Sequence, residues 1–286
     1  MISLILATLC SASIAILFKI SAEKQLNGQI VTVVNYLTAA IVSLFMILSK
    51  QNDRVMHIES GDFRTAVLLG VMTGFLFLAS FIMYQKSVRK NGASLSGMFA
   101  KLGILVPMLV SIIVWSERPS AVQSFGIVFA LLAVAIVNMK SRGESRDSRS
   151  ILLLFALFAT GGVAEFLNKV FQKSASMDYK PIFLFVVFST ALAISAFLLF
   201  RSGHKRELVR ASLIMGFFVG VPNLFSSFFL LEALDVFPAA IVFPTYSAGS
   251  ILIITLVSAF LLKEKLENKD RMAIGLTALG LILMNI

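Results

Sequence analysis

The chain has 286 residues, 58% of them hydrophobic and 14% charged, with a mean hydropathy of +0.92. Soluble domains carry about 25% charged residues, so this composition excludes an ordinary soluble protein and predicts an integral membrane protein. The formal net charge of +10 does not indicate nucleic acid, because the basic residues gather at the ends of apolar segments, where such residues contact anionic lipid.

Ten apolar segments follow one another along the chain, and each approaches or exceeds the roughly 20 residues that a helix needs to cross the hydrocarbon core. Strict alternation of apolar and polar residues, which a membrane barrel requires, is not seen in them. The sequence therefore predicts an all-α polytopic membrane protein with ten transmembrane helices. In chain order, the predicted spans are residues 2–20, 29–49, 65–85, 93–115, 120–139, 151–173, 181–200, 211–231, 236–262 and 268–286.

The first span begins at Ile2 without a basic region before it, so we interpret it as a transmembrane helix and not as a removable signal. Cys10, the single cysteine, lies in this span and cannot form an intramolecular disulfide. His57 and His204 fall in different loops without ligand spacing. With no set of nucleophile, base and orienting group in the spans either, we expect no metal, no cofactor and no enzyme activity.

An internal repeat relates the two halves of the chain. We predict two five-helix halves, residues 1–140 and 150–286, joined by a polar linker at 141–149. Because five is odd, the second half must enter the membrane in the opposite sense, which makes the halves inverted-topology repeats. The pairs that align, at offsets of 146 to 150 residues, are Gly70 with Gly216, Gly74 with Gly220, Glu117 with Glu264, and Lys19 with Lys169.

The spans around these pairs carry the motifs of a known family. They are Gly92-Ala93, Pro107 and Glu117-Arg118-Pro119 leading into Gly126, then Pro238-Ala239-Ala240, Pro244 and Glu264 leading into Gly275 and Gly280. In order, spacing and duplication the whole chain resembles the EamA-like branch of the drug/metabolite transporter superfamily. The resemblance implies a carrier that exports or exchanges small polar solutes through a cavity between its halves. We expect a monomer or homodimer in a bacterial inner (plasma) membrane, with a small-molecule substrate and no nucleic acid as partner.

Lys101 and Glu165 are charges deep inside apolar spans. Placing an ionised group there costs about 2.5 kcal/mol or more, so such residues usually mark a substrate or ion pathway. In the repeat they align with Ala248 and Ala15, which suggests that they serve this protein's own specificity. We predict that Lys101 binds a carboxylate or phosphate and that Glu165 binds a substrate ammonium or a coupling proton. Together they would suit a zwitterionic metabolite such as an amino acid.

Both charges also have a structural interpretation. Lys101 could pair with a buried acid for packing alone, or extend to the membrane surface. Glu165 precedes Lys169 by four residues, the favoured spacing for an ion pair within one helix, so this pair could simply neutralise itself.

Other polar side chains on the spans are weaker candidates for substrate binding. The amides equally suit hydrogen bonds between helices, and the two residues after Pro244 lie at a helix kink, where a backbone carbonyl lacks its usual donor. Near the span ends, Lys19, Glu117 and Glu264 are candidates for gate or structural roles. The weaker substrate-binding candidates are Ser94, Asn168, Lys169, Asn35, Asn223, Thr245 and Tyr246.

No phosphate-binding loop of the type G-x-x-x-x-G-K-[ST] is present, so ATP is not expected to drive transport directly. The sequence predicts a secondary active transporter that works by alternating access. One alternative is an organophosphate or nucleotide-sugar antiporter in which Lys101 and Lys169, with Lys19 as a further candidate, bind phosphate. Another is a non-transporting membrane scaffold or assembly subunit. Orientation stays open, because basic residues favour loops that would place both termini outside whereas the family resemblance implies the reverse.

Overall fold

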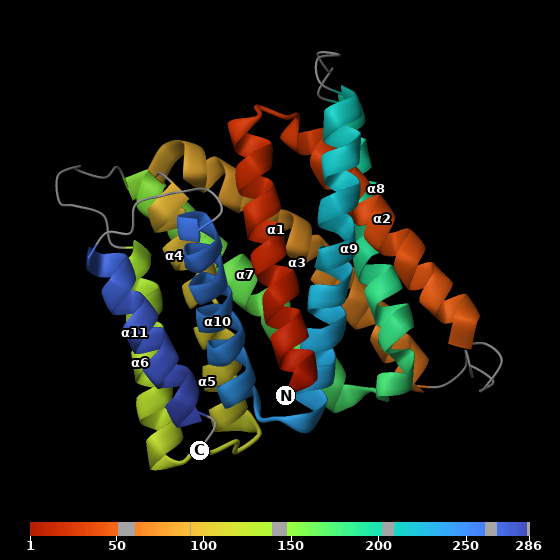
Figure 1. Ribbon diagram of the computed structural model, residues 1–286. Coiled ribbons are helices and arrows are strands. Elements are labelled where there is room, and N and C mark those ends of the chain that lie inside the picture. Colours follow the sequence, from red (N-terminus) through yellow and green to blue (C-terminus); the bar gives the residue numbers. More distant parts are fainter. Residues whose placement is uncertain (51–60, 92, 139–147, 202–208, 261–267, 285–286) are drawn as a thin grey trace. The chain divides into compact units, whose positions relative to one another are not determined.

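The computed structural model describes residues 1–50, 61–91, 93–138, 148–201, 209–260 and 268–284 (Figure 1). These residues form α-helices and one short 3-10 helix, with no strand among them, so the predicted all-α class is confirmed. The helices are α1 (Ile2–Glu23), α2 (Gly28–Lys50), α3 (Gly61–Asn91), α4 (Ala93–Leu102), α5 (Leu105–Val114), α6 (Ala121–Asn138), α7 (Ser148–Ser174), η1 (Met177–Tyr179), α8 (Lys180–Arg201), α9 (Val209–Val236), α10 (Ala239–Phe260) and α11 (Asn268–Met284).

Seven of these helices are long and apolar enough to cross a membrane, and shorter apolar helices occupy the fourth, fifth and tenth predicted spans. The ten predicted spans are therefore all helical. Within the fourth span, 93–115, the helix is interrupted, which the sequence did not predict: α4 ends at Leu102 and α5 begins at Leu105.

Backbone hydrogen bonds explain this break. The Ile104 N–H donates to the Lys101 carbonyl at 3.4 Å and the Val106 N–H to the Gly103 carbonyl at 3.0 Å, each three residues back instead of four. Pro107 has no N–H to donate to the Gly103 carbonyl, as a continuous helix would require. The tighter turn satisfies that carbonyl, and it separates α4 from α5.

The described residues form two compact units, and each unit contains helices from both halves of the sequence. Unit 1 comprises residues 1–78 and 167–235, and unit 2 comprises 79–166 and 236–286. The helices α3 and α7 each pass from one unit into the other. The compact units are therefore a different division of the chain from the two sequence halves.

In unit 1, α2 packs along α8, and glycines bring a third and a fourth helix onto this pair. A Cβ on Gly70 or Gly74 of α3 would clash with α8, and one on Gly216 or Gly220 of α9 would clash with α2. These contacts follow the internal repeat. The α2 residues that Gly216 and Gly220 meet lie 152 positions before the α8 residues that Gly70 and Gly74 meet. These facing pairs are Gly70 with Val186, Gly74 with Thr190, Gly216 with Val34, and Gly220 with Thr38.

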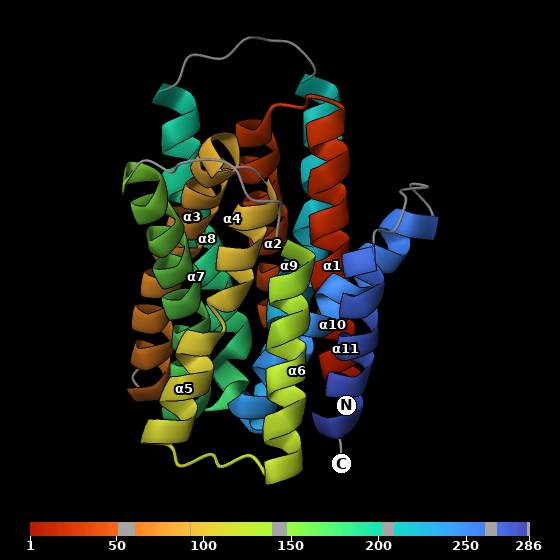
Figure 2. The ribbon, with the colours of Figure 1, turned by 90° about the vertical axis from the view of Figure 1, so that its left-hand side faces the viewer.

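In unit 2, α6 and α11 lie side by side, as Figures 1 and 2 both show. Their backbones meet at two glycines: a Cβ on Gly126 would lie 2.8 Å from the Gly280 carbonyl oxygen, and one on Gly280 would lie 2.9 Å from that of Gly126. The helix α10 packs against α5, α6 and α11. Ala240 and Ala248 of α10 are fully buried in the core that these helices share. This packing holds α10 firmly within unit 2.

Candidate functional site

Lys101 lies in the last turn of α4, two residues before the break at Gly103, and is half-buried. Its Nζ lies 5.9 Å from the ring centroid of Tyr246 on α10, within cation–π range. Glu165, on α7, is close enough to interact electrostatically with Lys101. All three residues belong to unit 2. The structure thus brings together the two deep charges and one of the weaker candidates.

A close contact between two backbones holds these charges in place. Gly162 lies three residues before Glu165 on α7, and a Cβ there would be 2.6 Å from the Gly103 carbonyl oxygen. Conversely, a Cβ on Gly103 would be 3.1 Å from the Gly162 nitrogen. The backbone of α7 therefore packs directly against the break, with little room for a side chain on either glycine. Lys101 and Glu165 lie two and three residues from this contact in their own segments.

Two serines that the sequence reasoning missed belong to the same unit. Ser247, next to Tyr246 on α10, and Ser111, on α5, are completely buried. Neither hydroxyl has a hydrogen-bond partner among the described residues. Buried hydroxyls nearly always find a partner, so these two are suited to a bound water or a polar solute. The only signal in the sequence is a serine within an apolar run, which is too common to single them out.

Glu117, a candidate for a gate or structural role, lies in the segment after α5 and caps α10. Its Oε2 accepts a hydrogen bond from the Ala239 N–H at 2.6 Å. A carboxylate at a helix N-terminus is favourable because it satisfies a free N–H and opposes the positive end of the helix dipole. The chain from α4 to the loop after α5 therefore contacts α10 twice, at its first residue through Glu117 and at Tyr246 through Lys101.

Replacing Glu117 by alanine is expected to lower the free energy of unfolding by about 1 to 2 kcal/mol, through loss of the cap and of the dipole interaction. Thermal melting of the purified protein in detergent measures this. Arg118→Ala is the matched control, because Arg118 is exposed beside it and should change stability by less than about 0.5 kcal/mol. Equal melting of the two variants would show that the cap is not stabilising.

Other candidates lie in unit 1. The Asn223 Nδ2 donates to Asn35 Oδ1 at 3.0 Å, so these two intramembrane amides are bonded to each other across α9 and α2. Asn168 and Lys169 are buried, and each interacts with another residue. Lys19, on α1, is half-buried and likewise has a partner.

The remaining predicted residues are placed as follows. The Thr245 Oγ1, in unit 2, donates to the Met284 Sδ of α11 at 3.8 Å, a weak hydrogen bond between helices. The side chain of Ser94 and all of Glu264 lie outside the described residues. Within the described ranges, no three histidine, cysteine, aspartate or glutamate side chains gather in a way that could hold a metal ion.

Comparison with known proteins gives three similarities. The profile of the EamA-like transporter family matches the chain twice, over residues 1–139 and 148–286. An uncharacterised protein of Haemophilus influenzae is 25% identical over 281 residues, which cover 95% of this chain and 93% of that protein. A protein of known crystal structure, 14% identical in sequence, has a TM-score of 0.77 and covers 99% of this chain and 94% of its own, which shows a shared fold.

Proposed function

The chain belongs to the EamA-like transporter family, and from this membership we propose that it is a secondary active transporter, an exporter or exchanger, of a small zwitterionic metabolite such as an amino acid. It is an integral, multi-pass membrane protein, and we place it in the inner membrane of a bacterium. The observation that carries the proposal is the pair of opposite charges, Lys101 and Glu165, at the helix break of unit 2.

In this proposal Lys101 binds the carboxylate of the substrate and Glu165 binds its ammonium group. Without substrate the two side chains neutralise each other, and a solute must separate them in order to bind. A zwitterion offers an opposite charge to both Lys101 and Glu165, whereas a solute with a single charge offers one to only one of them. Because opposite charges attract strongly in a poorly hydrated site, the two residues together select for solutes with both charges.

Neighbouring groups support a small polar ligand. The ring of Tyr246 lies within cation–π range of the Lys101 ammonium and can cover a bound solute. The unpartnered hydroxyls of Ser111 and Ser247 offer neutral hydrogen bonds in the same unit. The acidic Glu165 near Lys101 argues against the organophosphate alternative, because a carboxylate repels a phosphate. Two repeats of opposite topology provide the two access states that such a carrier needs.

Counterflow in liposomes tests this function. Purified protein is loaded with one unlabelled amino acid, and uptake of the labelled form is compared with uptake of the amine that lacks the carboxylate and the acid that lacks the amine. We expect exchange of the zwitterion and at least tenfold slower exchange of both analogues. Absence of exchange for amino acids, sugar phosphates and nucleotide sugars alike would favour a non-transporting scaffold.

Replacing Glu165 by glutamine tests the assigned roles within the pair. Exchange of the zwitterion is expected to fall at least tenfold, while the acid without an amine gains relative to it, because the ammonium partner is lost and Lys101 remains. Lys173→Gln, exposed on the same helix, is the control and should leave both rates unchanged. Unaltered discrimination in Glu165→Gln would return Glu165 to an ion-pair role, and loss of pH dependence alone would instead make it the coupling-proton site.

A further inference from the structure

The break between α4 and α5 belongs to one half of the repeat alone. In the alignment that pairs Lys101 with Ala248, Gly103 corresponds to Ser250 and Pro107 to Ile254, both on α10. The helix α10 is continuous through these two positions. The framework that the halves share therefore does not require a break at this point. The break accompanies Lys101, which likewise has no charged counterpart in the other half.

A contact made by backbone atoms sets how closely α7 approaches the break. A Cβ on Gly162 would lie 2.6 Å from both the Gly103 carbonyl oxygen and Val106 Cγ2. One on Gly103 would lie 3.1 Å from the Phe158 carbonyl oxygen. Atoms in ordinary contact with carbon lie about 3.5 Å away, so even a methyl group on Gly162 would separate the two segments by roughly 0.5 to 1 Å. They are thus nearly as close as their backbones allow.

This approach also limits the spacing of the two charges, because Lys101 and Glu165 lie two and three residues from the contact. Their side chains are restrained as well. The Lys101 Nζ lies 5.9 Å from the ring centroid of Tyr246, and Glu165 is near enough to interact electrostatically with Lys101. All of these residues belong to unit 2. The ammonium and the carboxylate are therefore held close together, which suits a solute whose own charges are close together.

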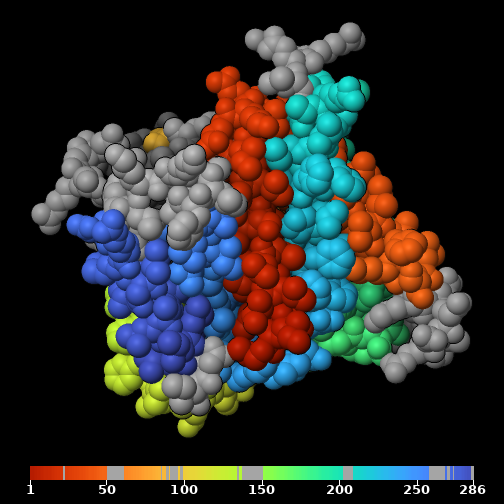
Figure 3. Space-filling model, viewed as in Figure 1, coloured from red at the N-terminus to blue at the C-terminus, as the bar shows by residue number. Residues whose placement is uncertain are grey.

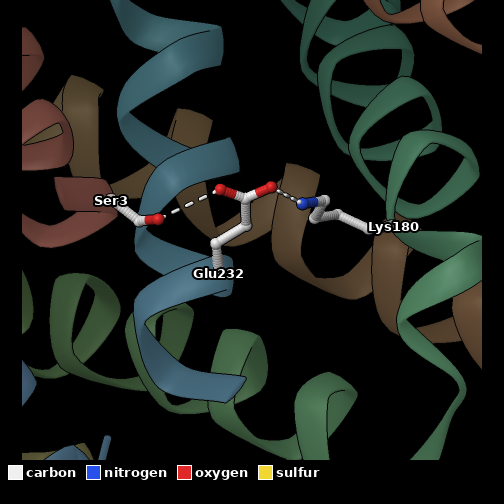
Figure 4. A network of polar contacts seen from close by, with 3 residues as sticks. All are labelled: Ser3, Lys180 and Glu232. Carbon is white, nitrogen blue, oxygen red and sulfur yellow. Dashed lines mark hydrogen bonds and ion pairs between the residues drawn. The ribbon is translucent and has the colours of Figure 1, made fainter. Parts of the chain in front are cut away.

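A second pair of opposite charges, in unit 1, is built differently. The Lys180 Nζ donates to Glu232 Oε1 at 2.9 Å, and the Ser3 Oγ donates to Glu232 Oε2 at 3.2 Å. Figure 4 shows the carboxylate lying between these two side chains. The Lys180 side chain is only 6% exposed, and its ammonium lies 3.5 Å from the ring centroid of Phe228. A solute would have to displace protein groups from both oxygens of this carboxylate.

This second pair is also the end of a longer interface between helices. Figure 3 shows the atoms of α1 lying directly along those of α9, and the Ser226 Oγ of α9 donates to the Ala7 carbonyl of α1 at 3.3 Å. Ser3 is at the start of α1, and Glu232 lies one turn before the end of α9. The pair in unit 1 therefore links helices, and it provides a control for the pair in unit 2.

We propose that the contact between Gly103 and Gly162 makes the carrier selective for zwitterions whose ammonium and carboxylate are attached to the same carbon atom. The inference rests on the proposed function, in which Lys101 binds the carboxylate and Glu165 the ammonium. The two glycines are positioning residues: they set the spacing of the residues that contact the solute. One more methylene between the solute's charges adds a carbon–carbon bond of about 1.5 Å, and the closed contact leaves no room for it.

Competition in counterflow measures this selectivity. Full-length protein in liposomes exchanges a labelled mixture of α-amino acids, and unlabelled α-, β- or γ-aminobutyrate is added as competitor. These isomers have the same atoms and differ only in where the ammonium is attached. Because a misplacement of 1 Å can cost about 100-fold, we expect α-aminobutyrate to compete about tenfold better than the β isomer, and the γ isomer to compete least.

Replacing Gly162 by alanine should lower the preference for α- over β-aminobutyrate about fivefold, because α7 moves away from the break. The opening is roughly half of the added carbon–carbon bond, so the preference should fall without reversing. Gly161→Ala is the matched control on the same helix. The obstacle to a Cβ at Gly161 is the Ser80 Oγ at 3.2 Å, a side-chain atom that can rotate aside, so the preference should not change.

Further variants cover the case in which Gly162→Ala fails to fold. Gly103→Ala meets its neighbours at 3.1 Å, a milder clash, and should shift the preference in the same direction by a smaller factor. Glu165→Asp keeps the glycine contact and shortens the carboxylate side chain by one methylene, so it too should favour the longer isomer. Glu232→Asp makes the same change in the pair of unit 1, and it should affect stability without altering the preference.

The preference is a ratio, so it does not depend on the amount of active protein. A purely structural contact would lower exchange in Gly162→Ala or Gly103→Ala and leave the ratio at the wild-type value. That result, or wild-type protein for which α-aminobutyrate competes no better than its isomers, would overturn this inference while transport stands. Complete absence of counterflow in the wild type would reject the transport function, and the selectivity with it.

Discussion

Replacing Lys101 by methionine is expected to abolish exchange of the zwitterionic substrate while the protein still folds and inserts. Methionine nearly matches the length and volume of the lysine side chain but has no charge. A lost charge-assisted hydrogen bond costs about 3 kcal/mol, which is roughly 100-fold in affinity. Counterflow measures the loss, and a thermal shift with substrate reports binding independently, because a bound ligand raises apparent stability. Near-normal exchange in Lys101→Met would contradict a contact between Lys101 and the solute.

Two further variants separate charge recognition from packing. Lys86→Met removes an exposed lysine in the same unit and should exchange substrate normally. The double variant Lys101→Met with Glu165→Gln removes both charges, so it should recover any stability that Lys101→Met loses through the missing attraction between Lys101 and Glu165. Transport should stay absent in it. Recovered transport in the double variant would mean that the pair serves packing alone.

Replacing Gly74 by valine is expected to destabilise unit 1 by about 3 kcal/mol or to prevent its folding. A Cβ on Gly74 would overlap the Val187 carbonyl oxygen and lie 2.9 Å from Thr190 Cβ, so α3 would have to move away from α8. Overpacking of this kind usually costs about 1 to 3 kcal/mol, and the obstacle here includes backbone that cannot rotate aside. The melting temperature in detergent and the yield of monodisperse protein measure the effect.

The repeat predicts a matching result on the other side of unit 1. Gly220→Val should cost a similar amount, because a Cβ there would lie 2.6 Å from both the Asn35 carbonyl oxygen and Thr38 Cβ. Gly275→Val is the control: nothing lies within 4 Å of its Cβ position, so only helix propensity changes, in favour of valine by a few tenths of a kcal/mol. Comparable losses at Gly275 and Gly74 would show that packing is not the cause.

The residues of the candidate site could be predicted from the sequence, but not their proximity. Lys101 and Glu165 could be selected as charges in apolar runs because placing an ion in hydrocarbon is costly wherever it occurs. Their proximity could not be predicted, since it depends on contact between Gly103 and Gly162, which lie far apart in the chain. The bond between Asn35 and Asn223 likewise joins two helices distant in sequence. Lys180 and Glu232 escaped notice because charges near span ends are ordinary and do not reveal burial.

The helical class, the ten spans and the repeat follow from residue order alone, because a backbone in lipid must satisfy its own hydrogen bonds and long apolar runs can do so only as helices. The repeat can likewise be recognised from residue order, since glycines at matching offsets are visible without knowing which helices they contact. Which side chains meet is a different matter. Pro107 indicates that the helix is disturbed, but only the structure shows that α4 and α5 separate at Gly103 and that this point packs against α7. Contacts between residues far apart in sequence depend on how the helices pack, and through them the fold brings Lys101 to Glu165 and Glu232 to Lys180.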